Sequence, residues 1–190
     1  MRKISTLLIC AFLALTSCGT DSVEGPPGPP GPEGPSGVNG FIGTAIDITG
    51  DFTAENDYTL SVIFDDLDVE VFESDAVLVY LKVGNSGTDA NGIPIEIFTP
   101  IPQTYFEVDK TIQYNFNYTF EDVLIFLDGV NSNGTLLNFG ALSPDYRINK
   151  KFRIIVLPAA FAQTKQSNLD LTDMKEVMKA LNMKESDVIK

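Results

Sequence analysis

The sequence predicts a mainly β protein: an antiparallel β-sandwich, or a barrel-like sheet, with one amphipathic helix near the C-terminus. Residues 111–120 alternate strictly between apolar and polar side chains, which is the period of a strand with one buried face. Other short apolar runs are separated by glycine- and asparagine-rich turns, as in antiparallel sandwiches. No strand–helix alternation is visible, so a doubly wound α/β fold is not expected.

The alternating segment, TIQYNFNYTF, indicates which side chains are buried. Its apolar positions are Ile112, Tyr114, Phe116, Tyr118 and Phe120, and the positions between them hold Thr, Gln and Asn. Aromatic rings can stack on sugars, but these rings share the apolar face of one strand. We therefore expect them in the core.

Six other segments have the composition of strands. Residues 76–83 and 123–127 are almost continuously apolar, which favours strands buried on both faces. The remaining candidates are residues 45–50, 58–64, 94–100 and 152–157. The turn signals between strands are Gly84-Asn85-Ser86-Gly87, Asn91-Gly92, Asp128-Gly129 and Asn133-Gly134. These assignments place the β domain at residues 44–165.

Residues 166–190 are the expected helical segment, packed on the β domain. Asp170 is the expected N-cap of a helix of about three turns, and Asp173 and Lys179 suit its dipole. The apolar stripe of this helix comprises Leu171, Met174, Val177, Met178 and Leu181. We expect the stripe to pack on the sheet rather than on a membrane or a partner.

The N-terminus, residues 1–17, has the pattern of an export signal. Two basic residues precede an apolar stretch in which ten of the twelve residues from Ile4 to Leu15 are apolar. This length is typical of a signal peptide and too short for a membrane-spanning helix. The following Leu15-Thr16-Ser17-Cys18 resembles a bacterial lipobox, which implies that Cys18 is the site of lipid attachment; several acyl chains anchor stably. A plain secretory leader with a chance cysteine is the alternative.

A collagen-like segment follows a short acidic tether, residues 18–24. Residues 25–43 have glycine at every third position, and the first five of these glycines are Gly25, Gly28, Gly31, Gly34 and Gly37. A triple helix requires this spacing because only glycine fits at its axis. A run this short would form a homotrimeric stalk only if the β domain also trimerised. The leading interpretation is a monomeric polyproline II spacer, and chance composition is the third alternative.

Charge and cysteine content limit the partners. The chain has 13 basic and 26 acidic residues, so no nucleic acid is expected, since phosphate binding needs clustered Lys and Arg. Residues 18–145 hold 21 acids and two bases, whereas residues 146–190 hold nine bases and five acids. We expect the basic part to fold back on the acidic body; a basic face towards phospholipid or an acidic polymer is the alternative. Cys10 leaves with the leader and Cys18 is lipidated, so no disulfide is expected.

Few residues carry recognisable chemistry. The sequence has no histidine and no phosphate-binding glycine loop, so neither an enzyme nor a cofactor is expected. The acidic stretch from Asp65 to Asp75 is interpreted as the solvated face of an edge strand. A calcium site or a catalytic carboxylate pair are the alternatives there. Residues 128–134 are interpreted as a hairpin turn, with a weak calcium site as the alternative.

The lipobox, the acidic tether, the GPPGPPGPEG run and the β-rich domain together resemble uncharacterised collagen-like lipoproteins of the Bacteroidota. The stretches that carry the resemblance within the β domain are residues 71–81, 101–106, 112–129 and 152–162. The resemblance implies a cell-envelope location, with the outer membrane as the expected membrane and either periplasmic or surface exposure. It implies a membrane anchor at Cys18 and no assigned activity. The expected function is a non-enzymatic envelope protein whose head binds or supports something outside the membrane; a calcium- or glycan-binding head for adhesion or nutrient capture is the alternative.

Overall fold

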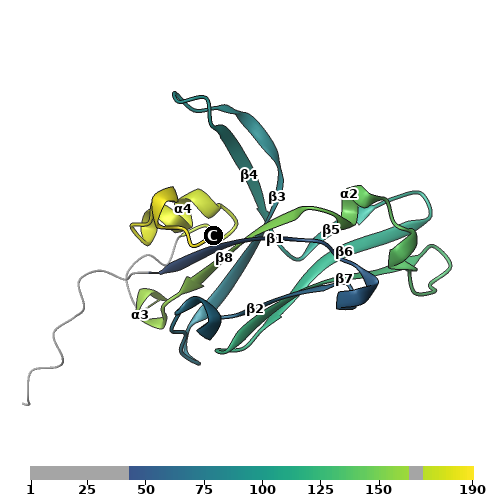
Figure 1. Cartoon of the computed structure of the whole chain (residues 1–190), viewed down its shortest axis with the longest axis horizontal. Coiled ribbons are helices and arrows are strands. Elements are labelled where there is room, and N and C mark those ends of the chain that lie inside the picture. The colour runs from purple at the N-terminus through teal and green to yellow at the C-terminus, as the bar shows by residue number, and fades with distance from the viewer. Residues whose placement is uncertain (1–42, 163–168) are drawn as a thin grey trace, which may run out of the picture. The chain divides into compact units, whose positions relative to one another are not determined.

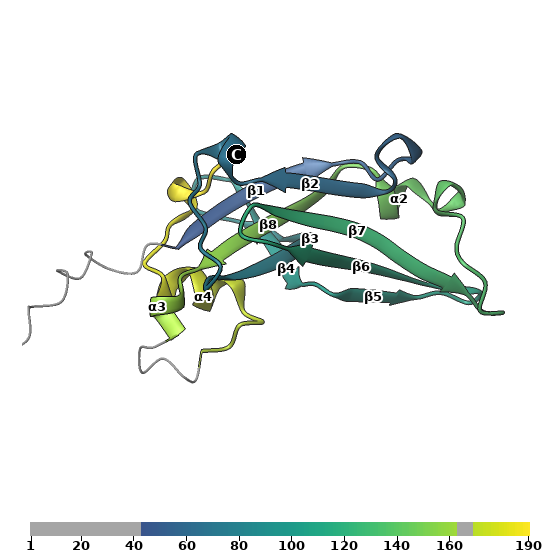
Figure 2. The same ribbon diagram turned by 90° about the horizontal axis from the view of Figure 1, so that it is seen from below.

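The computed structural model describes residues 43–162 and 169–190, and within these ranges eight strands form two antiparallel sheets (Figure 1). Sheet A has the strand order β1 (Thr44–Gly50), β8 (Lys150–Leu157), β3 (Ala76–Thr88) and β4 (Pro94–Pro100). Sheet B has the order β2 (Thr59–Ile63), β7 (Asp122–Asn131), β6 (Lys110–Tyr118) and β5 (Gln103–Phe106). The sheets stack as a sandwich and do not close into a barrel, which confirms the predicted fold class (Figure 2).

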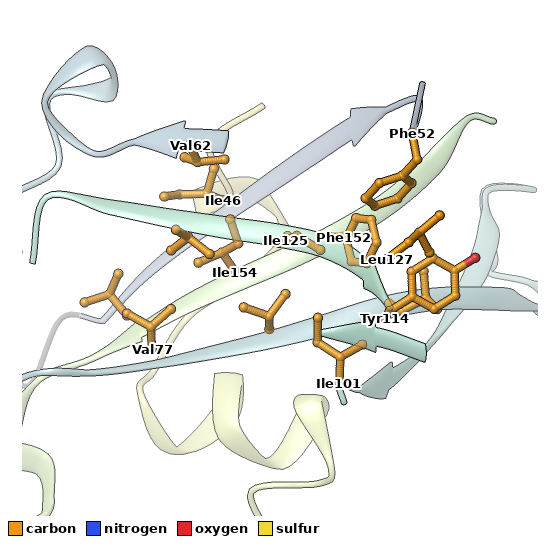
Figure 3. Close-up of a cluster of buried hydrophobic side chains, with 14 of the residues drawn as sticks. Ile46, Phe52, Val62, Val77, Ile101, Tyr114, Ile125, Leu127, Phe152 and Ile154 are labelled. Atoms are coloured by element: carbon orange, nitrogen blue, oxygen red, sulfur yellow. The ribbon is translucent and has the colours of Figure 1, made fainter. Parts of the chain in front are cut away.

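The space between the sheets is filled by a hydrophobic core (Figure 3). Phe52, Tyr114 and Phe152 contact one another there, with ring centroids 5.9 to 6.0 Å apart. The Tyr114 hydroxyl donates a hydrogen bond to the Tyr146 carbonyl at 2.6 Å, so its buried oxygen is satisfied. The prediction that the alternating aromatic face is core is confirmed at Tyr114, whereas Tyr118, at the end of β6, is 45% exposed.

Two of the predicted turns lie inside strands. β3 continues through residues 84–87, and beyond Leu81 it pairs only with β4, so that the two strands project together as a ribbon (Figure 1). β7 continues through residues 128–129 because Gly129 lets the strands approach closely: a Cβ there would lie 2.4 Å from the Thr111 carbonyl oxygen. In both places the pairing with a neighbouring strand overrides the local preference for a turn.

The other two predicted turns are confirmed. Gly92 and Gly134 both have a φ of 79°, in the left-handed region that favours glycine.

The short strand β5 has no counterpart among the predicted strands. Its four residues follow Pro100 and Pro102, which obscure the alternation that would have identified it.

The prediction of an edge strand in the acidic stretch is wrong. Asp65–Leu67 form a 3-10 turn, and Asp68 follows with a φ of 54°. Residues 69–75 then cross the surface without joining a sheet. The burial still alternates, since Val69 and Val71 enter the core between exposed acids. The sequence pattern was therefore correct about the buried side chains and wrong about the backbone pairing.

The C-terminal segment covers the outer face of sheet A. The short helices are α2 (Pro144–Arg147), α3 (Ala159–Ala162) and α4 (Met174–Ala180). The N-cap of α4 is Asp173, whose carboxylate accepts the N–H groups of Lys175 and Glu176 at 2.9 and 3.2 Å. The predicted cap, Asp170, is wrong: it accepts the N–H of Thr172 in the preceding turn, so the helix is shorter than expected.

The apolar stripe of α4 packs on the sheet as predicted, with one correction. Its buried members form a second core with outward side chains of β1, β3 and β8; they are Met174, Val177, Met178 and Leu181. Leu171 lies before the helix and is 43% exposed, so it does not belong to the stripe. Farther along, Ile189 pairs in parallel with Ile46 and shields the free edge of β1.

Candidate functional site

A pocket of about 600 Å³ lies on the outer face of sheet A, between the base of the β3–β4 ribbon and the C-terminal segment. We call it the charged pocket. Six of its ionisable side chains come from β1, β3, β4, β8 and the last turn of the chain: Asp47, Lys82, Glu96, Lys151, Arg153 and Glu185. Lys151 and Arg153 lie two residues apart on the same face of β8, and Asp47 is the register partner of Arg153 on β1, so strand pairing brings together groups that are far apart in sequence.

Arg153 is the centre of the charged pocket and is only 1% exposed. Its Nε and Nη2 atoms donate to the two carboxylate oxygens of Asp47 at 2.7 and 3.0 Å. Its Nη1 and Nη2 atoms donate to Glu185 at 2.6 and 2.8 Å. The guanidinium also lies 4.9 Å from the ring centroid of Phe98. This bidentate geometry suits the planar fork of arginine and satisfies a buried charge.

Two lysines extend the network across the sheet. The Lys151 ammonium lies 2.9 Å from Asp47 Oδ2 and 2.5 Å from Glu96 Oε2. The Lys82 ammonium lies 2.7 Å from Glu96 Oε1. Positive and negative groups therefore alternate from Lys82 to Arg153, and each carboxylate lies between two cations.

This alternation holds the carboxylates in their charged form. Burial raises the pKa of Asp47, but hydrogen bonds from Arg153 and Lys151 outweigh it and leave the pKa below its usual value. The pKa of Glu96 is lowered in the same way: burial opposes ionisation, and hydrogen bonds from Lys151 and Lys82 prevail. A general acid at neutral pH needs a raised pKa, so neither group is tuned for proton transfer.

The arrangement serves instead to fasten the C-terminal segment to the sheet. Glu185, in the turn after α4, meets a strand arginine that is itself fixed by Asp47. Nearby, the Tyr80 hydroxyl donates to the Leu171 carbonyl at 2.7 Å. The outer face of sheet A is therefore closed by hydrogen bonds and ion pairs as well as by the apolar stripe of α4.

The expected folding-back of bases on the acidic body holds in β8 but not in residues 169–190, the described part of the terminal segment. Lys151 and Arg153 pair with acids of β1 and β4, as the charge asymmetry suggests. At the terminal segment the contact runs the other way, because Glu185 supplies the acid and the sheet supplies the base. The individual partners had no sequence signal, since Asp47 and Arg153 are 106 residues apart.

The outer face of sheet B, which we call the open face, has a different composition. It carries side chains from all four strands, and among them only Asp122 and Asp128 are charged. Its other members are Thr59, Ser61, Ile63, Thr104, Phe106, Thr111, Gln113, Asn115, Asn117, Leu124, Phe126 and Val130. Leu124 and Ile63 are 36% and 49% exposed, which shows that the described residues leave this face uncovered.

Hydrogen bonds between side chains order part of the open face. Gln113 Nε2 donates to Thr104 Oγ1 at 2.7 Å, and Asn115 Nδ2 donates to Gln113 Oε1 at 2.8 Å. These three residues form a row of uncharged polar groups along β6 and across to β5. The Thr, Gln and Asn positions of the alternating segment thus lie on the outer face of the sheet, where Thr111, Gln113 and Asn115 are half-buried and Asn117 is exposed, as period-two alternation predicts.

The predicted lipid attachment site, Cys18, and the predicted collagen-like glycines lie outside the described residues. The acidic stretch is described, and some of its members line a shallow pocket with Phe120 and Glu121. No three metal-binding side chains gather into a possible ion site within residues 43–162 and 169–190. Asp75 has a structural role: its carboxylate accepts the N–H groups of Phe72 and Ala159 at 3.1 and 3.0 Å.

The predicted hairpin turn after β7 is displaced by a few residues. Residues 128–129 stay in the strand, and the reversal is closed by Asn131, whose N–H donates to the Thr135 carbonyl at 2.8 Å. Asn133 Oδ1 accepts both the N–H and the hydroxyl of Thr135, at 3.1 and 2.7 Å. The side-chain oxygens suggested for calcium therefore stabilise the turn itself.

Over the part of the chain that the structure describes, no helix has the length and apolar character needed to span a bilayer. No family model matches the chain, and no curated protein or solved structure matches it.

Proposed function

We propose that this chain is a non-enzymatic, lipid-anchored protein of the bacterial cell envelope, whose β-sandwich head has a binding or structural role. The lipobox at Cys18 supports the anchor, and the Gly-X-Y run supports a stalk between membrane and head. As a polyproline II strand of about 3.1 Å per residue, residues 25–39 would hold the head roughly 45 Å from the anchor.

The observation that carries the non-enzymatic role is the state of the carboxylates in the charged pocket. Asp47 and Glu96 both have a lowered pKa and lie between cations. An acid–base pair would need carboxyl groups whose pKa values are pushed apart. Asp47 instead holds Arg153, which pairs with Glu185 of the C-terminal segment, and this structural use supports a head that works through its surface.

The anchor is tested by fractionating cells that express the full chain. The natural chain should be found in the membrane fraction, and Cys18→Ala should move it out, because the acyl chains are lost. Cys10→Ala is the matched control, since it changes a cysteine inside the leader and should leave the fractionation unchanged. Membrane association that survives Cys18→Ala would refute the anchor. Protease treatment of intact cells then separates surface exposure from periplasmic exposure.

The stalk is tested by light scattering on the detergent-extracted chain. We expect a monomer, since a run this short is a weak triple helix. A trimer that is lost on deleting residues 25–39 would show instead that the Gly-X-Y segment assembles three chains. Deletion should leave the unfolding of the head unchanged in either case.

A second candidate function is glycan binding by the head, in adhesion or nutrient capture. The open face favours it, because that face is broad, exposed and nearly uncharged.

A further inference from the structure

We propose that the open face of sheet B binds a neutral glycan; this inference rests on the proposed role of the head as a binding module and names its ligand class.

An apolar strip runs along β7 in the middle of the open face. It consists of Leu124 and Phe126, which lie two residues apart on the same side of the strand, about 6.8 Å along it. Leu124 is 36% exposed and Phe126 is half-buried, so both present apolar surface to solvent. Such a strip offers contact area to a flat, partly apolar molecule.

Polar side chains border this strip on both sides. The register partners of Leu124 are Ser61 on β2 and Asn117 on β6. The register partners of Phe126 are Thr59 on β2 and Asn115 on β6. Hydroxyls on one side and amides on the other therefore flank an apolar centre.

A sugar ring has the matching construction, with C–H groups on its face and hydroxyls around its rim. A sugar hydroxyl both donates and accepts hydrogen bonds, and so do the hydroxyl and amide side chains of the open face. Gln113 and Asn115 are already aligned by the hydrogen bonds between them, which lowers the entropic cost of ordering them on a ligand.

The charge of the open face selects a neutral occupant. Its two charged side chains, Asp122 and Asp128, are the outward positions of β7 on either side of Leu124 and Phe126, so they oppose an anionic ligand. The chain as a whole carries a net charge of −13, which repels anionic polymers over the whole surface. Both carboxylates already accept hydrogen bonds within the chain: Asp122 Oδ1 accepts the Thr119 hydroxyl at 2.6 Å, and Asp128 Oδ1 accepts the Gly129 N–H at 2.7 Å. An uncharged, hydroxyl-rich polymer meets none of these penalties.

A second copy of this chain is the competing occupant. Self-association through this face would press the polar rows of Thr, Ser, Gln and Asn against one another without water, and buried polar groups must all find partners. Two chains of the same high net charge would also repel. The glycan avoids both costs.

The test measures binding of neutral and anionic polysaccharides to the purified full chain. Extraction uses a detergent without a sugar headgroup, so that the detergent does not occupy the face. Affinity electrophoresis in dextran, mannan and a β-glucan provides the neutral probes, and polygalacturonate provides the anionic contrast. We expect retardation in at least one neutral probe and none in polygalacturonate.

The paired variant Asn115→Asp with Asn117→Asp keeps the shape of the face and adds two negative charges beside the strip. It should weaken binding to the neutral probe about tenfold, because carboxylates cannot donate to sugar hydroxyls. Asn85→Asp with Asn91→Asp, the same pair of changes on the exposed β3–β4 ribbon and its turn, is the matched control and should bind like the natural chain. Thermal unfolding of each variant verifies that the head remains folded.

Three results would overturn the proposal: no neutral probe retards the natural chain, the paired variant binds as well as the control, or polygalacturonate binds equally. A dimer that the paired variant dissociates, with no glycan binding, would identify a second copy as the occupant. The anchor is judged separately. A chain that fractionates to the membrane and binds no glycan refutes this inference alone, whereas a chain that binds glycan without Cys18-dependent fractionation refutes the anchor alone.

Discussion

The two outer faces of the sandwich differ in whether another part of the described chain covers them. Sheet A has an outer face with apolar and charged side chains, and the C-terminal segment covers it with α4 and Glu185. Sheet B has an outer face of apolar and mostly uncharged polar side chains, with Asp122 and Asp128 as its charged members, and the described residues leave it exposed. Both faces belong to four-stranded antiparallel sheets over one shared core.

The difference shows how a strongly acidic chain distributes its charges. Its most buried charges are paired in a row under the C-terminal segment, where Arg153 is 1% exposed. A buried charge is tolerated only with close partners. These buried ion pairs therefore require the C-terminal segment to stay in place on the outer face of sheet A. The open face has no such requirement, and its side chains remain available for a ligand.

The largest effect is expected from Arg153→Met, which removes the central cation of sheet A. Asp47 keeps one cation, Lys151, but loses its bidentate partner in a site where its side chain is 5% exposed. The free energy of unfolding should fall by about 3–5 kcal/mol in urea titrations.

Two companion variants sharpen this result. Glu185→Gln should cost less than about 1 kcal/mol, because that side chain is 72% exposed and solvent already screens it. Adding Asp47→Leu to Arg153→Met should recover part of the loss, since the unpaired carboxylate is then gone. If Arg153→Met alone is neutral, the covering of sheet A does not depend on the ion pairs.

The next effect is expected from Leu181→Ala, which tests the apolar part of the same covering. Leu181 is 2% exposed and packs within the second core, so its truncation leaves a cavity. We expect a loss of about 2–4 kcal/mol in the free energy of unfolding. Leu171→Ala is the matched control: Leu171 is 43% exposed, and the same chemical change should cost less than about 0.5 kcal/mol there. Equal losses would contradict the assignment of the stripe.

The sequence predicts the apolar packing behind one of these tests but not the ion pairs behind the other. Period-two alternation identified the buried face of β6, because burial depends on neighbouring residues in one strand. The apolar stripe of α4 was found for the same reason, apart from Leu171. The Arg153–Asp47–Glu185 contact could not be found, since it joins residues brought together only by strand order and by the C-terminal turn.

The errors have a similar physical origin. The acidic stretch alternates like a strand, but a strand also needs a free edge to pair with, and the chain makes a 3-10 turn there. Asp170 and Asp173 are equally good caps by composition, and the packing of Met174 decides between them. The open face was visible in the sequence only as the polar half of an alternation. The polar border of its apolar strip follows from the register of β2, β6 and β7.

A smaller effect is expected from pH. The pKa values of Asp47 and Glu96 in the folded chain lie below their ordinary values of 3.8 and 4.5. Their contribution to stability is therefore complete above those ordinary values and is lost as the pH falls through the lower folded ones. Urea titrations from pH 6 down to about pH 3 should show stability falling in the acid range. Asp47→Asn should flatten that fall, and an unchanged pH profile would contradict the role of Asp47.

The smallest effect on stability is expected on the open face. Asn117→Lys changes an exposed side chain of β6 that lies beside Leu124 and Ser61, and it should alter the free energy of unfolding by less than about 0.5 kcal/mol. The same urea titration measures it. A small change in the free energy of unfolding for Asn117→Lys, together with a large loss for Arg153→Met, would show that the outer face of sheet A contributes to stability. It would also show that the open face does not. A loss above about 1 kcal/mol would mean that another part of the chain packs on this face, because a solvated position does not respond so strongly to a lysine. In that case glycan binding should also be weak in the natural chain, and the two measurements together would distinguish a covered face from an open one that lacks a ligand.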